Sequence, residues 1–170
     1  MKVILYMAIT PNGLIAKSDD DTNFTSKEDH LGFRDACLES KAIIVGRRTY
    51  DLLNYDPEFY FPQCSYFVVS QTAQEPKENF VFCQPDPQKI LALIESKGFN
   101  SACVIGGGKT NTTFLQANLV DEIYLDVEPA IFGQGIPLFS PADFEFKLDL
   151  LEVKNLSPQT VQLHYRVKKQ

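Results

Sequence analysis

The chain has 170 residues, of which 44% are hydrophobic and 22% are charged, and this balance predicts one folded domain over residues 1–170. A net charge of −6 argues against a general nucleic-acid-binding protein, which needs a basic surface. No apolar run approaches the roughly 20 residues that span a bilayer. The short apolar run at the N-terminus has no small-residue cleavage site after it, so we expect a cytoplasmic protein without a membrane partner.

The cysteines do not form a metal-binding pattern. They stand at positions 37, 64, 83 and 103, none at CxxC spacing and none with a histidine at ligand spacing. We therefore predict no metal site. Cys37 and Cys103 lie in apolar segments, and we interpret them as buried free thiols.

The first strand is predicted at residues 2–9, a continuous apolar run that ends at the turn signal of residues 10–13. Ser26 is predicted to cap a helix, because its hydroxyl can accept a backbone N–H and acidic residues follow in the first turn. Asp29 and Phe33 are four residues apart, so they share one face of this helix.

Buried strands and helices alternate along the next hundred residues. We expect strands at 42–45, 66–69, 80–82, 102–105 and 122–127, and helices at 86–97 and 109–119. This alternation predicts an α/β sheet that is mostly parallel. Residues 144–153 and 160–168 alternate polar and apolar side chains around a turn, so the sheet should end in an antiparallel hairpin.

Glycine and hydroxyl residues gather at the predicted carboxyl ends of the strands, where open α/β sheets bind ligands. Gly106-Gly107-Gly108 joins a strand to a helix, so its backbone can approach a pyrophosphate closely. A plain tight turn is the alternative interpretation. The spacing fits neither GxxxxGK[ST] nor GxGxxG.

A second anion site is predicted at the GRRT turn of residues 46–49. Arg47 and Arg48 can fork onto a phosphate, although two solvated surface arginines would look the same. The chain has only four arginines, and these two stand at a strand end. The strand at 66–69 ends in Ser70 without an acid, which favours NADPH over NADH.

Asp29 is the leading acid–base candidate. It lies in the first turn of the predicted helix beside an apolar face, where a carboxylate can have a raised pKa or hydrogen-bond a heterocycle. The alternative is an acid that only interacts with the helix dipole. His30 and His164 are isolated, and we assign them surface or strand roles.

The motifs, taken in order, resemble the dihydrofolate reductase-like superfamily. The resemblance is closest to the reductase domain of the bifunctional riboflavin-biosynthesis deaminase/reductase. It is carried by NGLIA (12–16), SKED (26–29), AIIVGRRTY (42–50), FVVSQT (67–72), VIGGGKT (104–110) and LVDEIYLDVEPAIFGQGIPLF (119–139). It implies a mixed, mostly parallel sheet of about eight strands flanked by helices, and hydride transfer from NADPH.

Individual roles follow from the resemblance by position. The implied cofactor-binding residues are Ala8 and Ile15 at the nicotinamide, Gly46, Arg47, Arg48 and Thr49 at phosphates, Ser70 and Gln71 at the adenosine, and Ile105, Gly106, Gly107, Gly108, Lys109 and Thr110 at the pyrophosphate. The implied substrate residues are Phe24, Asp29, Phe33 and Asp126. The chain departs from folate reductases in having no tryptophan, and it contains no HxE…PCxxC deaminase signature.

We therefore expect an NADPH-dependent oxidoreductase that reduces a small pterin- or pyrimidine-like heterocycle, with Asp29 orienting or protonating the substrate. One alternative is a non-catalytic NADP(H)-binding or sensor module. Another is an Arg47/Arg48 site for a different phosphorylated metabolite. Relatives of the riboflavin type commonly pair through sheet edges, so we also expect a homodimer.

Overall fold

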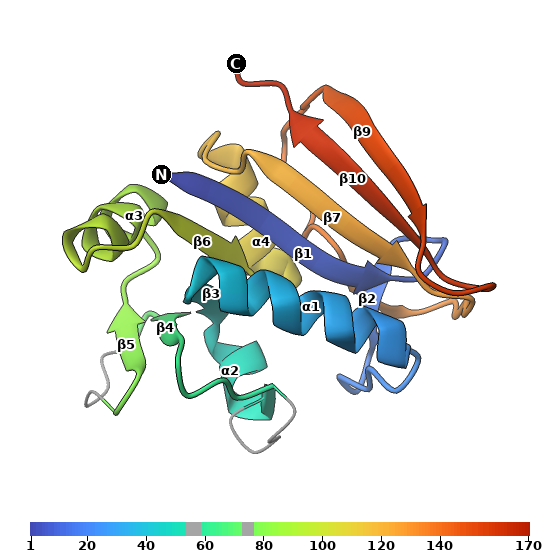
Figure 1. Cartoon of the computed structure of the whole chain (residues 1–170), viewed down its shortest axis with the longest axis horizontal. Coiled ribbons are helices and arrows are strands. Elements are labelled where there is room, and N and C mark those ends of the chain that lie inside the picture. The colour runs from blue at the N-terminus through green and yellow to red at the C-terminus, as the bar shows by residue number, and fades with distance from the viewer. Residues whose placement is uncertain (54–58, 73–76) are drawn as a thin grey trace.

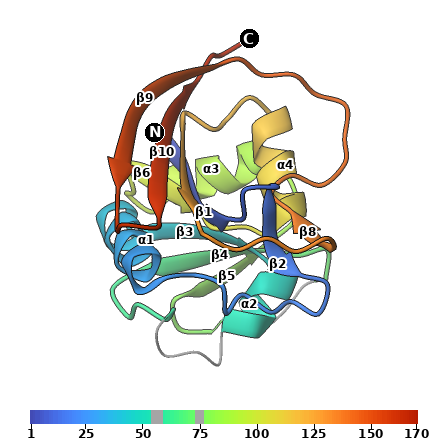
Figure 2. The same cartoon turned by 90° about the vertical axis from the view of Figure 1, so that its right-hand side faces the viewer.

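An eight-stranded sheet with helices on both faces forms the body of the computed structural model, which describes residues 1–53, 59–72 and 77–170 (Figures 1 and 2). The strands are β1 (Lys2–Ile9), β2 (Leu14–Lys17), β3 (Ala42–Gly46), β4 (Ser65–Val69), β5 (Phe80–Cys83), β6 (Ser101–Val104), β7 (Glu122–Val127), β8 (Gly135–Pro137), β9 (Leu148–Asn155) and β10 (Val161–Val167). The helices are α1 (Lys27–Ser40), α2 (Arg47–Leu53), α3 (Pro87–Ser96) and α4 (Gly108–Gln116).

The strand order of the large sheet is β5-β4-β3-β6-β1-β7-β10-β9. Its first six strands pair in parallel, and β10 pairs antiparallel with both β7 and β9. The predicted fold class, a mostly parallel sheet with a C-terminal antiparallel hairpin, is therefore confirmed. A second sheet, made of β2 and β8, was not predicted, because strands of four and three residues are too short to show a period.

Strand β3 shows how the sheet divides two hydrophobic cores. All five of its residues are buried, and successive side chains point to opposite faces. Ile44 belongs to the core that contains side chains of α3 and α4, whereas Ile43 belongs to the core that contains side chains of α1 and α2. Figure 2 shows the same division, with α3 and α4 on one side of the sheet and α1 and α2 on the other.

Helix α1 begins where the sequence predicts it. The Ser26 hydroxyl accepts the Asp29 backbone N–H at 3.2 Å, and the helix ends at Lys41, whose left-handed backbone has a φ of 58°.

The GRRT segment differs from the prediction: helix α2 begins at Arg47, so the predicted turn is the N-terminus of a helix. The helix propensities of Arg and Leu favour this helix.

All four cysteines are free and buried. Within the described ranges, no helix has the length and apolar character that crossing a membrane would require.

Candidate functional site

A cleft of about 670 Å³ opens at the carboxyl ends of β1, β3 and β4 and beside the start of α4. It is lined by most of the residues that the sequence nominates. These are Ala8, Ile15, Asp29, Phe33, Gly46, Arg47, Arg48, Thr49, Ser70, Gln71, Ile105, Gly107, Gly108, Lys109 and Thr110. One continuous cleft is therefore lined both by the segments that are predicted to bind phosphates and by the candidate acid, Asp29.

Three nominated residues do not line this cleft. Gly106 has a φ of +96° and lies against the Met7 side chain. The Phe24 ring packs edge-on against Phe132, with their centroids 5.5 Å apart. Asp126 has no exposed surface and lies behind the wall of the cleft. Phe24 and Asp126 are therefore not among the described residues that line the cleft.

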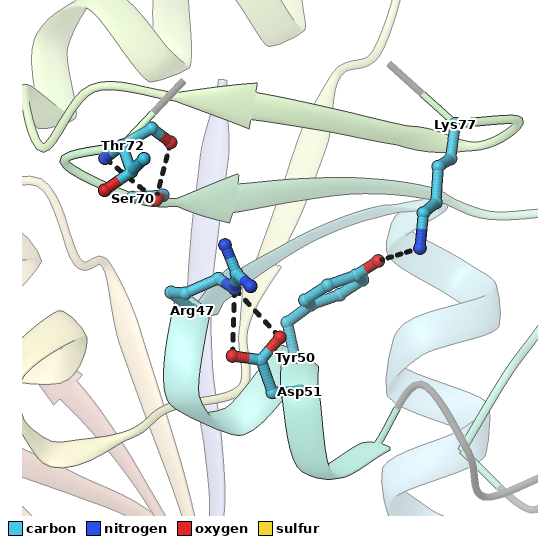
Figure 3. A network of polar contacts seen from close by, with 6 residues as sticks. All are labelled: Arg47, Tyr50, Asp51, Ser70, Thr72 and Lys77. Atoms are coloured by element: carbon cyan, nitrogen blue, oxygen red, sulfur yellow. Dashed lines mark hydrogen bonds and ion pairs between the residues drawn. The ribbon is translucent and has the colours of Figure 1, made fainter. Parts of the chain in front are cut away.

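The ends of β3 and β4 bring Arg47 and Ser70 together. Gly46 pairs with Val69 across these parallel strands, so the residues that follow them are neighbours. Figure 3 shows Arg47 held by Asp51, whose two oxygens accept from Arg47 Nε at 2.8 and 2.9 Å. The Ser70 hydroxyl accepts the Thr72 N–H at 3.2 Å and donates to its carbonyl at 2.9 Å. A cation and an ordered hydroxyl therefore stand at adjacent strand ends.

Arg48 connects the other side of this region. Its Nε and one terminal nitrogen donate to Asp20 Oδ2 at 3.0 and 2.8 Å, and both residues line the cleft. The Arg48 side chain is 69% exposed, so this surface ion pair can be exchanged for a ligand phosphate at small cost.

The N-terminus of α4 is the third part of the cleft that suits a phosphate, after Arg47 with Ser70 and after Arg48. Its N-cap is Gly107, which supplies no side-chain cap, whereas α1 and α3 are capped by Ser26 and Asp86. A Cβ on Gly46 would lie 2.6 Å from Thr110 Oγ1, so only glycine allows this close approach of β3 to α4. The uncapped N–H groups and the helix dipole favour an anion here.

At the α1 side of the cleft, buried carboxyl groups replace the cations. Asp29 is 5% exposed, and among the described residues its Oδ1 has no hydrogen-bond partner. Behind it, Asp126 accepts from the Tyr6 hydroxyl at 2.6 Å and from Gln162 Nε2 at 2.8 Å. Asp126 thus has two donors of its own, whereas the carboxyl of Asp29 is buried against that of Asp126.

These surroundings keep a proton on Asp29. Burial, then the charge of Asp126 and a hydrogen bond with it, then the charge of Glu128, raise the pKa of Asp29 to about 8. Burial also raises the pKa of Asp126, but its hydrogen bonds from Tyr6, Gln162 and Asp29 oppose this shift. Burial and the neighbouring carboxylates therefore favour the protonated form of Asp29, and Asp126 is placed to accept a hydrogen bond from it.

Glu128 fixes the first turn of α1 against the sheet. Its carboxylate accepts from the Ser26 N–H at 3.0 Å, from the Ser26 hydroxyl at 2.7 Å and from the Thr160 hydroxyl at 3.1 Å. Since the same Ser26 hydroxyl accepts the Asp29 N–H, Glu128 holds Asp29 in place through one intermediate. Sequence reasoning missed Glu128, although its spacing from Asp126 in the LDVEP segment was an available signal.

Aromatic side chains cover the cleft next to Asp29. The Phe33 ring contacts Tyr6 and Phe59 edge-on at centroid distances of 6.1 and 5.6 Å. The His30 ring lies 5.4 Å from that of Phe59, and its Nε2 is 2.7 Å from the Thr25 hydroxyl. This apolar surface suits a flat ring and explains the desolvation of Asp29.

The comparisons with known proteins agree with this fold. The sequence model of the RibD C-terminal domain matches residues 1–162. The chain is 28% identical to the uncharacterized protein YwjB of Bacillus subtilis, covering 96% of this chain and 97% of YwjB. A putative riboflavin biosynthesis protein from Shewanella sp. PV-4 superposes with a TM-score of 0.86 at 23% identity, over 99% of this chain and 100% of that one.

A larger protein also contains this fold. The diaminohydroxyphosphoribosylaminopyrimidine deaminase/5-amino-6-(5-phosphoribosylamino)uracil reductase of Thermotoga maritima superposes with a TM-score of 0.78 at 19% identity. The match covers 98% of this chain but only 56% of the Thermotoga protein. These findings confirm the resemblance that the sequence motifs indicate: the chain belongs to the family of RibD C-terminal domains, with a dihydrofolate reductase-like fold.

Proposed function

We propose that this protein is an NADPH-dependent reductase that transfers hydride to a small pterin- or pyrimidine-like heterocycle. One observation carries the proposal: a single cleft is lined by three groups that suit a phosphate and by a carboxyl group, that of Asp29, whose pKa is raised to about 8. The three groups are Arg47 with Ser70, Arg48, and the N-terminus of α4. The reductase-like neighbours of the family support this chemistry more than a sensor module.

The residues present fit the proposed cofactor. The uncapped N–H groups of α4 and Arg48 would hold the pyrophosphate, and Arg47 with Ser70 would hold the 2′-phosphate. No acid stands among residues 70–72, where an NAD site usually places one on the ribose. When bound, NADPH supplies the hydride.

The chain's own part in the reaction is proton supply and orientation. Asp29 would hydrogen-bond a ring nitrogen or its neighbour and give up its proton there as the ring is reduced. Asp126 and Glu128 keep that proton available at neutral pH, because a second negative charge beside them is unfavourable. The rings of Phe33 and Phe59 would cover the substrate and exclude water.

Titration of the protein with NADPH and with NADH tests the cofactor claim. We expect a thermal shift and a fluorescence change with NADPH at concentrations at least about tenfold lower than with NADH, the equivalent of one phosphate contact. No response to NADPH at millimolar concentration would refute the claim.

Turnover separates a reductase from a sensor. NADPH oxidation is measured with a panel of pterins, pyrimidines and carbonyl compounds, for the wild type and for Asp29→Asn. We expect turnover that the substitution abolishes while NADPH binding persists. NADPH binding without turnover anywhere in the panel would favour the sensor.

We also propose a homodimer formed through β9, the edge strand of the sheet. Four apolar side chains of this strand are at least 39% exposed: Leu148, Leu150, Leu151 and Val153. An apolar edge strand of this kind pairs readily with a second copy. Sedimentation should give the mass of two chains for the wild type and of one chain for Val153→Lys. A wild-type mass of one chain would refute the dimer.

A further inference from the structure

We propose that Tyr6 and Gln162 are positioning residues, whose hydrogen bonds hold the negative charge of the buried acid pair on Asp126 and leave the proton on Asp29. This inference rests on the proposed function, in which Asp29 supplies a proton, and it adds the residues that keep this proton beside the cleft. It follows from how hydrogen-bond donors are distributed between the two buried carboxyl groups.

The two carboxyl groups of the pair differ in their donors. The Tyr6 hydroxyl donates to Asp126 Oδ2 at 2.6 Å, and Gln162 Nε2 donates to Asp126 Oδ1 at 2.8 Å, so each oxygen of Asp126 has a donor. Asp29 Oδ1 has no hydrogen-bond partner among the described residues, and the Asp29 carboxyl hydrogen-bonds with that of Asp126. Donors stabilise the charged form of a carboxyl group, so the charge is favoured on Asp126 and the proton on Asp29.

Tyr6 and Gln162 also orient each other. Gln162 Nε2 donates to the Tyr6 hydroxyl oxygen at 3.1 Å, while that hydroxyl gives its own hydrogen to Asp126. A side-chain amide has two N–H groups, so Gln162 can serve Tyr6 and Asp126 at once. Burial and the charge of Asp126 raise the pKa of Tyr6 well above its ordinary value, so Tyr6 keeps its hydrogen and remains a donor.

Helix α1 covers this network at Gly32. A Cβ on Gly32 would collide with the Tyr6 hydroxyl and would lie 3.9 Å from Asp126 Oδ2. Tyr6, Asp126 and Gln162 are each at most 9% exposed. Solvent does not readily replace a donor that is removed from such an enclosed network, so the loss of either donor should change the charge balance of the pair.

The titratable groups around the pair come from the elements packed against it. Tyr6 stands on β1, Glu128 directly follows β7, and His30 follows Asp29 on α1 and lines the cleft, whereas β10 supplies the neutral Gln162. Glu128 accepts three hydrogen bonds of its own, so its charge is stabilised independently of the pair. Because the Glu128 charge acts on both aspartates, the donors to Asp126 decide which of the two holds the proton.

The location of the proton decides whether a ligand can receive it. Asp29 lines the cleft, whereas Asp126 has no exposed surface. A proton on Asp126 would be enclosed behind α1, whereas a proton on Asp29 lies at the wall where the substrate is proposed to bind. The two donors to Asp126 therefore act on the reaction through Asp29, without touching the substrate.

Carbon-13 NMR of the aspartate carboxyl groups measures the position of the proton without any substrate. The wild type, Tyr6→Phe and Gln162→Met are titrated between about pH 4 and pH 9.5, and Asp29→Asn and Asp126→Asn assign the two resonances. We expect the upper titration step of the wild-type pair at the Asp29 carboxyl. Either substitution removes a donor to Asp126 and should reduce the preference of the proton for Asp29 about tenfold, so that the Asp126 carboxyl takes a larger share of this step.

Tyr66→Phe is the matched control. Tyr66 is buried in the same sheet, and its hydroxyl also has two partners: it accepts the Phe61 N–H at 2.7 Å and donates to the Phe59 carbonyl at 3.1 Å. Loss of this hydroxyl should leave both aspartate titrations unchanged. Tyr6→Phe retains the ring that packs against Phe33 and Tyr124, and thermal unfolding checks that each variant is folded.

Turnover links the position of the proton to the reaction. We expect Tyr6→Phe and Gln162→Met to lower kcat about tenfold at pH 7 while NADPH binding stays unchanged. An upper titration step that remains at Asp29 as in the wild type in either variant, or a wild-type step at Asp126, would overturn the proposal. So would unchanged kcat in both variants of a chain that turns over.

Failure of the proposed function gives a different result. A wild type that shows the expected titration of Asp29 but neither binds NADPH nor oxidises it with any substrate would refute the reductase. Normal NADPH oxidation, together with titration curves that the two substitutions do not change, would refute the positioning role alone.

Discussion

Replacing Asp29 with asparagine is expected to stabilise the folded protein at neutral pH. The pKa of Asp29 rises from 3.8, its ordinary value, to about 8 in the folded state. Between these two pH values the folded chain holds one more proton than the unfolded chain. The stability from this group is therefore complete below pH 4, falls as the pH rises and is lost above the folded pKa.

The size of the effect follows from the shift. Each pKa unit corresponds to about 1.4 kcal/mol, so at pH 7 the wild type has lost about 4 kcal/mol relative to acid pH through this group. Asparagine carries no ionisable proton, and its amide can donate to Asp126 as the protonated carboxyl does. We expect Asp29→Asn to raise the free energy of unfolding by about 2–4 kcal/mol at pH 7 and by little near pH 4.

Urea denaturation at several pH values between 4 and 8.5 measures this difference directly. The control is Asp35→Asn, the same chemical change on the same helix at a side chain that is 69% exposed. It should alter stability by less than about 0.5 kcal/mol. The reasoning fails if Asp29→Asn is no more stable than the wild type at pH 7, or if the two proteins show the same dependence on pH.

Three further outcomes are expected. The kcat/KM of the wild type should fall about tenfold per pH unit above pH 8, as Asp29 loses its proton, and a rate that stays constant to pH 9.5 would contradict its role as the acid. Arg47→Ala should weaken NADPH binding about tenfold in a fluorescence titration. The control is Arg34→Ala, which removes an arginine of α1 that is also paired with an aspartate. Equal effects of the two substitutions would argue against Arg47 as a cofactor ligand. Gly32→Ala should lower the free energy of unfolding by about 1–3 kcal/mol, measured by thermal unfolding, because the new Cβ would collide with the Tyr6 hydroxyl. The control is Gly133→Ala, whose Cβ would meet nothing within 4 Å. Comparable stability of the two variants would show that the Tyr6 side chain moves aside without cost.

The sheet and the phosphate-type end of the cleft could be predicted because their signals are local. Residues Ala42–Gly46 are one apolar run followed at once by two arginines, so strand and site are read from the same stretch of nine residues, 42–50. Open α/β sheets bind ligands beyond the carboxyl ends of their strands, so the separate strand ends can be predicted to line one cleft before any contact between them is known. The secondary structure of Arg47 was still mistaken, because a short helix after a strand shows no clear period.

The acid cluster could be predicted only in part, because its contacts cross the whole chain. The hydrogen bond between Gln162 and Tyr6 joins residues 156 positions apart, and no local pattern marks either as part of a site. In the sequence Gly32 is only a residue of low helix propensity, whereas the structure shows that the Tyr6 hydroxyl occupies the place of its Cβ. Asp29 was found because a helix start places it, whereas its partners depend on the pairing of β1, β7 and β10.

The position of these partners explains how the cleft keeps two opposite electrostatic environments. Tyr6 and Gln162, which donate to Asp126, stand on β1 and β10, the two strands that flank β7 in the rigid sheet. The acid end is therefore set by packed strands whose geometry does not depend on a ligand. The cationic end is set by exposed arginines and an uncapped helix start, whose partners can be exchanged. A cofactor that arrives with phosphates can replace Asp20 and Asp51 as partners of the arginines. Nothing comparable releases Asp126 from its donors Tyr6 and Gln162, so the acid end keeps its arrangement whether or not a ligand occupies the cleft.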